Sequence, residues 1–126
     1  MDKSLPQITD SEWLIMKTLW EKSPLKNRDI VEAVSKKSSW NNKTIETLLK
    51  RLVDKDAVGY NQINSKTREY YPIVSQEECI RVENETFLKK VYDGSVSMMM
   101  ANFLKHRKLS KEEIEKLKTM IEENDE

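Results

Sequence analysis

The side chains best suited to contact a partner lie in one stretch, from Trp40 to Asp56. Its apolar residues recur at the i, i+3, i+4, i+7, i+8 spacing of one buried helical face, and they are Ile45, Leu48, Leu49, Leu52 and Val53. At about 100° per residue, polar residues occupy the opposite side of such a helix. They are Lys43, Thr47, Lys50 and Asp54, flanked by Thr44, Glu46 and Arg51. The stretch therefore predicts a helix with one face to bury and one to present.

The presented residues have the chemistry of a nucleic-acid contact. Lysine neutralises phosphates or reaches guanine, and threonine meets base edges at the helix end that enters a major groove. Asn41 is the expected N-cap, with Trp40 and Ile45 as a hydrophobic staple. Between Lys36 and Arg68 there are 8 basic and 3 acidic residues, so positive charge is concentrated here. Taken alone, the window is more typical of a solvated amphipathic helix, so the choice depends on the rest of the chain.

Catalytic and metal chemistry find little support in the sequence. Cys79 and His106 are the only nucleophilic or metal-binding candidates of their types. A lone histidine is usually a surface residue, and Cys79 falls at the apolar staple position of its helix. Three adjacent methionines, Met98 to Met100, point in different helical directions and suit an adaptable packed interface. We therefore expect no enzyme, no cofactor and no metal.

Composition narrows the class of protein. The 126 residues hold 22 basic and 22 acidic side chains, and a single cysteine excludes an internal disulfide. No apolar run approaches the roughly 20 residues of a membrane span, and the start of the chain lacks a signal-peptide core. These features predict a soluble, cytoplasmic protein without membrane insertion. Only 2 Gly and 3 Pro indicate a mainly helical chain.

The elements before residue 75 predict a winged helix, with a domain over residues 1–74. Thr9 and Glu12 form the capping box of a first helix, and Asn27 is the expected cap of a second that ends near Lys36. After the Trp40 helix, residues 58–63 and 67–73 are strand-like, with a turn at 64–66. In a winged helix the third helix reads a groove and the hairpin touches the DNA backbone, here through Lys66 and Arg68.

Residues 75–126 predict three more helices. A capping box from Ser75 to Glu78 opens a helix to about Tyr92, Asp93 and Gly94 supply a left-handed stop, and Ser110 opens the last helix. Their apolar stripes form no evident second core, so we expect a dimerisation domain that buries them against a second copy. The expected contacts are Phe87, Val91, Val96, Met99, Met100, Phe103, Leu104, Ile114, Leu117 and Ile121.

Three segments resemble the BlaI/MecI penicillinase repressors: residues 7–13, residues 40–52, and the run from Phe87 to Gly94. The resemblance covers essentially the whole chain. It implies a homodimeric winged-helix repressor that binds palindromic operator DNA. The expected DNA-binding residues are Asn41, Asn42, Lys43, Thr44, Glu46, Thr47, Lys50, Arg51, Lys66 and Arg68. It also implies control of β-lactamase or related resistance genes. Relief would follow cleavage between Asn102 and Phe103 through a protease linked to a β-lactam sensor.

The sequence departs from this family at three places. Asn41 and Asn42 stand where Ser-Pro is frequent, Glu46 where relatives tend to carry Arg or Gln, and Asp56 where a glycine usually ends the helix. Two alternative functions remain open. One is a copper-type or other stress-responsive repressor, although the copper-responsive relatives end in a four-cysteine motif that this chain lacks. The second is a winged-helix module that binds a protein partner instead of DNA.

Overall fold

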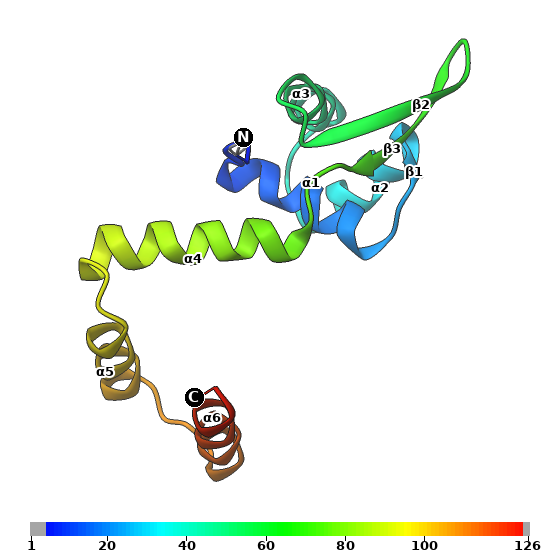
Figure 1. Cartoon of the computed structure of the whole chain (residues 1–126). Helices are drawn as coiled ribbons and strands as arrows, with labels where there is room; N and C mark the ends of the chain where they lie inside the picture. Colours follow the sequence, from blue (N-terminus) through cyan, green and yellow to red (C-terminus); the bar gives the residue numbers. More distant parts are fainter. Residues whose placement is uncertain (1–4, 125–126) are drawn as a thin grey trace. The chain divides into compact units, whose positions relative to one another are not determined.

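The computed structural model describes residues 5–124, which form two compact units that divide between Arg81 and Val82 (Figure 1). The first unit holds helices α1 (Asp10–Glu21), α2 (Asn27–Lys37) and α3 (Asn42–Asp54) and strands β1 (Leu25–Lys26), β2 (Val58–Asn64) and β3 (Thr67–Pro72). Helix α4 (Gln76–Tyr92) runs across the division, and α5 (Val96–His106) and α6 (Lys111–Glu123) follow it. The predicted mainly helical class and winged-helix order are confirmed. Within the described residues, no helix is long and apolar enough to cross a membrane.

Side-chain caps fix the starts of several helices where the sequence predicted them. Thr9 accepts a hydrogen bond from the backbone N–H of Glu12, whose carboxylate accepts from the N–H of Thr9, a complete capping box. Asn41 accepts from the N–H of Thr44 at 2.9 Å and caps α3. A second complete box joins Ser110 and Glu113 at the start of α6. These bonds satisfy backbone donors that the first helical turn leaves unpaired.

The predicted cap of the second helix was wrong. Asn27 is the first residue inside α2, and the N-cap is Lys26, which makes no side-chain capping bond. The physical reason is a short strand that the sequence analysis missed, because two residues carry no periodicity. Leu25 and Lys26 pair with Tyr70 and Glu69 of β3, so Lys26 is held extended and the helix begins directly after it.

The sheet has the order β1-β3-β2 with both pairs antiparallel. Strands β2 and β3 form the hairpin, which projects beyond the three helices in Figure 1 and which we call the wing. The register runs from Val58 opposite Pro72 to Asn64 opposite Thr67, with an irregularity between Gln62 and Asn64. Strand β2 therefore continues one residue into the predicted turn.

A single hydrophobic core holds the three helices against the sheet. It contains the predicted α3 residues Ile45, Leu48, Leu49 and Leu52 together with Ile15, Met16, Leu19, Ile30, Val34, Ala57, Val58, Tyr70, Val74 and Cys79. All three tryptophans pack against this core while partly buried, as expected. The indole N–H of Trp20 donates to the carbonyl oxygen of Val74 at 2.9 Å, which fixes the segment after the wing to α1.

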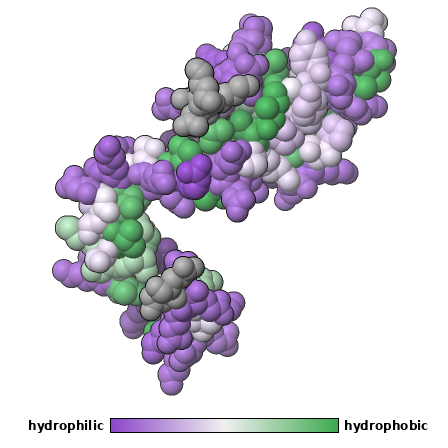
Figure 2. Space-filling model, viewed as in Figure 1, coloured by the Kyte–Doolittle hydropathy of each residue, from purple (hydrophilic) through white to green (hydrophobic). Residues whose placement is uncertain are grey.

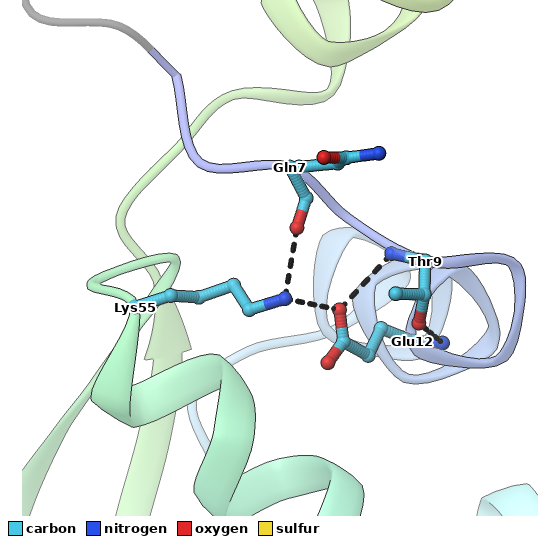
Figure 3. A network of polar contacts seen from close by, with 4 residues as sticks. All are labelled: Gln7, Thr9, Glu12 and Lys55. Atoms are coloured by element: carbon cyan, nitrogen blue, oxygen red, sulfur yellow. Dashed lines mark hydrogen bonds and ion pairs between the residues drawn. The ribbon is translucent and has the colours of Figure 1, made fainter.

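The C-terminal end of α3 is tied to the start of α1 by a buried ion pair (Figure 3). The Lys55 ammonium donates to the Glu12 carboxylate at 2.7 Å and to the carbonyl oxygen of Gln7 at 2.8 Å. The Glu12 side chain is only 1% exposed, and that of Lys55 is 29% exposed. Burial alone raises the pKa of Glu12, but hydrogen bonds from Lys55 and the Thr9 backbone, with the charge of Lys55, lower the pKa overall. The network ties the end of α3 to the segment that caps α1.

Two aspartates occupy left-handed backbone positions. Asp56, directly after α3, has φ of 63°, and Asp93, after α4, has φ of 51°, followed by Gly94 at 87°. The predicted helix stop at Asp93 and Gly94 is therefore confirmed, and Asp56 follows α3 in the left-handed conformation that is usual for glycine.

The second unit leaves most of its apolar side chains exposed. Ser95 caps α5 by accepting from the N–H of Met98. Neither α5 nor α6 has a buried residue. Figure 2 shows apolar surface gathered over α5. Gathered exposed apolar side chains of this kind are typical of an interaction surface.

Candidate nucleic-acid interface

Helix α3 presents one continuous polar face to solvent. The eight predicted contact residues of this segment are all exposed, and they are Asn41, Asn42, Lys43, Thr44, Glu46, Thr47, Lys50 and Arg51. The opposite side of the same helix supplies four core residues, so the helix cannot rotate without exposing them. The predicted division into a buried and a presented face is therefore confirmed. We call the presented side the α3 face.

The N-terminal half of the α3 face is already partly organised by hydrogen bonds. The Thr47 hydroxyl donates to the carbonyl oxygen of Lys43 at 2.9 Å, and the hydroxyl oxygen can still accept a hydrogen bond. Asn41 uses its side-chain oxygen as the helix cap. A shallow hollow of about 350 Å³ opens here, lined by Asn41, Lys43, Thr44, Thr47, Leu48 and Arg51. Most of its lining residues are polar and can form hydrogen bonds with the edge of a base pair, and Leu48 is the one aliphatic residue among them.

One cation of the α3 face is paired within the helix. Lys50 donates to Asp54, one turn later, at 3.1 Å, and the two side chains are 77% and 63% exposed. An exposed pair of this kind contributes little free energy and is weakened by salt. Lys50 can therefore exchange Asp54 for a phosphate at small cost.

The wing carries the two remaining predicted contact residues, Lys66 and Arg68, both exposed. Lys66 sits in the turn, where its backbone N–H donates to the side chain of Asn64. Arg68 lies on β3 with its guanidinium carbon 4.2 Å from the centre of the Tyr60 ring, and its Nε donates to Gln62 at 3.0 Å. Two side chains of the wing thus contact the guanidinium of Arg68, whereas the bond at Lys66 involves only its backbone.

A cleft separates α3 from the wing within the first unit. It has a volume of about 380 Å³ and is lined by Asn27, Glu46, Leu49, Lys50, Val53, Asp54, Tyr60, Arg68 and Tyr70. A neighbouring hollow of about 300 Å³ on the wing side shares Asn27, Arg68 and Tyr70 with it. The structure therefore brings Lys50 and Arg68, which lie on different elements, to one concave surface.

Sequence reasoning missed two residues of this surface. Tyr60 and Gln62 were assigned only to a strand, yet both contact Arg68. Alternation along β2 places them on one face. Only the register, which sets Gln62 opposite Arg68, places the arginine beside them.

The predicted dimerisation residues lie in the second unit or on α4, and most of them are exposed. Phe87 packs edge-on against Tyr92 at 6.0 Å, and the Tyr92 hydroxyl donates to the Asn102 side chain at 3.4 Å. Asn102 and Phe103 are consecutive residues within α5, and Phe103 is 44% exposed. The structure contains one chain, so their role in pairing stays a prediction.

No group of three or more metal-binding side chains occurs in the described part of the chain. Cys79 is buried in the first core, and His106 is exposed at the end of α5. Neither lies among the residues of the α3 face or the wing.

Comparison with known proteins assigns this chain to a family. The penicillinase repressor model matches residues 8–123, nearly the whole chain. The chain belongs to the penicillinase repressor family. A penicillinase repressor of Bacillus licheniformis is 35% identical over 122 residues, covering 97% of this chain and 94% of that relative. The methicillin resistance regulatory protein MecI of Staphylococcus aureus is 31% identical over 121 residues, covering 96% and 98%.

A solved structure of a related repressor matches part of the chain. It is the monomeric form of B. licheniformis BlaI in complex with the blaP half-operator, with a TM-score of 0.53 and 32% identity. The match covers 61% of this chain and 93% of that one. The relatives are named repressors and regulators, which confirms the family suggested by the sequence motifs and the expectation of a non-enzymatic protein.

Proposed function

We propose that this protein is a transcriptional repressor that binds double-stranded operator DNA through the α3 face and the wing. The observation that carries the proposal is the shared placement of the predicted contacts. All ten are exposed, and all lie on α3, its cap or the wing of one unit. The half-operator complex of a 32% identical BlaI domain supports the same mode of binding.

The expected contacts divide into two kinds. Thr44 and Thr47 meet base edges from the N-terminal half of α3, while Lys43 and Lys50 neutralise phosphates or reach guanine. Lys66 and Arg68 bind the backbone from the wing. Glu46 lies among these cations and can accept from a cytosine amino group, which makes it the expected determinant of operator preference.

We further propose that the protein acts as a homodimer on a palindromic operator. The exposed apolar side chains of the second unit support this, since burial of residues such as Phe103 and Ile121, 44% and 66% exposed, would stabilise a pair. Two half-site readers that are joined bind more tightly than either alone, because the second contact becomes intramolecular. The names of the relatives support β-lactamase or other antibiotic-resistance genes as the regulated targets.

Cleavage between Asn102 and Phe103 is the proposed route of inactivation. The bond lies in the middle of α5, so a protease would have to unwind about two turns of helix to reach it. The helix is exposed and lacks buried residues, which keeps the cost of unwinding small. Severing α5 would separate the dimer while leaving the α3 face intact.

The test is a fluorescence anisotropy titration of the purified protein on the DNA upstream of its own gene, at two salt concentrations. Tight binding as a dimer that weakens steeply with salt is the expected result. Genome-wide DNA capture identifies the site if the operator lies elsewhere. A stable protein that captures no DNA would contradict the proposal and favour docking on a protein partner.

A further inference from the structure

The guanidinium of Arg68 is held between two side chains of the neighbouring strand. We infer that Tyr60 and Gln62 are positioning residues that fix Arg68 for a backbone phosphate of double-stranded DNA; the inference rests on the proposed DNA binding. The guanidinium carbon lies 4.2 Å from the centre of the Tyr60 ring, within cation–π range, and its Nε donates to the Gln62 amide oxygen at 3.0 Å. Two contacts of different kinds thus restrain one otherwise flexible side chain.

The support behind Tyr60 leads to the hydrophobic core. The rings of Tyr60 and Tyr70 lie 5.8 Å apart at an angle of 48°, and Tyr70 is only 8% exposed. Tyr60 itself is 38% exposed, so one side of its ring contacts a core residue while another is available to Arg68. Through Tyr60, the position of the Arg68 side chain is therefore coupled to the hydrophobic core of the first unit.

The support behind Gln62 leads to the turn of the wing. Its amide nitrogen donates to the carbonyl oxygens of Asn64 at 2.7 Å and Thr67 at 3.4 Å. Because both of these partners are acceptors, the amide oxygen must face the other way, toward Arg68. The orientation of the acceptor is thus set by the backbone of the turn before any ligand binds.

Arg68 lines two hollows: the cleft toward α3, which also holds Glu46 and Asp54, and a hollow on the wing side that contains no acidic residue. Within the described residues, Arg68 has no hydrogen-bond partner other than Gln62, so its terminal nitrogens can donate to a ligand. The hollow on the wing side is lined by Asn27, Gln62, Ser65, Lys66, Arg68 and Tyr70. It holds two cations and no carboxylate, which suits a phosphate. An arginine already ordered in this place loses less conformational entropy when the phosphate binds.

The test is a set of double-mutant cycles on operator DNA, measured by anisotropy over a range of salt concentrations. Tyr60→Leu and Gln62→Met should each weaken binding about three- to tenfold. In an Arg68→Ala background the same substitutions should change the affinity less than about twofold. Arg68→Ala should also lower the slope of log affinity against log salt by about one, because a phosphate contact is lost. Tyr60→Leu should leave that slope unchanged, since the charge of Arg68 remains.

Two controls separate positioning from general damage to the wing. Tyr60→Phe keeps the ring and should restore most of the affinity lost in Tyr60→Leu. Tyr71→Leu alters a neighbouring aromatic on the opposite face of β3 and should bind DNA as the wild type does. Wild-type affinity for both Tyr60→Leu and Gln62→Met, or equal losses with and without Arg68, would overturn the inference while the proposed function stands. A wild type that fails to bind DNA would overturn both.

Discussion

Replacing Lys55 by methionine should destabilise the first unit more than the removal of any exposed lysine. The substitution leaves the Glu12 carboxylate, 1% exposed, without its ammonium partner. Breaking a fully buried pair costs about 3–5 kcal/mol. Here Glu12 keeps its bonds to Thr9, and Lys55 is 29% exposed, so we expect a loss of about 2–3 kcal/mol at pH 7. Lys50→Met is the matched control, because it removes an exposed pair and should cost less than about 0.5 kcal/mol.

The dependence on pH gives a second readout of the same substitution. The pKa of Glu12 in the folded protein is lowered from an ordinary value of 4.5. Its ion pair therefore stabilises the wild type fully above that value, and the contribution is lost as the pH falls through the lowered pKa. Without Lys55, its hydrogen bond and its charge no longer lower the pKa of Glu12, so the folded pKa is higher than in the wild type and the variant gains relative stability as Glu12 takes up a proton. The difference between wild type and Lys55→Met should therefore shrink as the pH falls from 7 into the range in which Glu12 takes up a proton.

Urea denaturation followed by tryptophan fluorescence measures this difference. All three tryptophans of the protein pack against the core of the first unit, so their emission reports its unfolding. A Lys55→Met variant as stable as Lys50→Met at pH 7 would refute the reasoning. So would a difference between wild type and Lys55→Met that stays constant with pH.

Three further substitutions test the backbone and packing of the same unit by urea denaturation. Asp56→Gly should stabilise the protein by about 0.5–1 kcal/mol, because glycine adopts a φ of 63° without strain; a loss would mean that the aspartate side chain itself stabilises the turn. Gly59→Ala should cost less than about 1 kcal/mol, because the added Cβ, 2.7 Å from the Tyr71 ring, meets only the exposed end of that side chain, which can move aside; a larger loss would show that the ring is held in place. Asn41→Ala should cost about 1 kcal/mol through the lost α3 cap, and Asn41→Ser should recover most of it.

The sequence predicted those parts of the fold that depend on local chemistry. Capping residues such as Thr9 and Asn41 satisfy donors three residues away, so their signals are complete within a short window. The buried face of α3 follows from helical periodicity alone. The assignment of ten contact residues combined this local pattern with the family resemblance.

The features that the sequence did not predict depend on partners far along the chain. Strand β1 is defined by its pairing with Tyr70 and Glu69, more than 40 residues later. The Glu12 and Lys55 pair spans 43 residues, and nothing in either segment identifies the other as its partner. The role of Tyr60 likewise required the register of the hairpin. Tertiary pairing, not propensity, determines these three features.

The measurement that most directly tests DNA binding by the α3 face is the salt dependence of operator affinity for single lysine variants. Lys43→Ala and Lys50→Ala should each lower the slope of log affinity against log salt by about one, because each removes a phosphate contact. Lys17→Ala, an exposed lysine on α1 outside the face, should leave the slope at its wild-type value. Equal slopes for all three variants and the wild type would contradict the assignment of the α3 face.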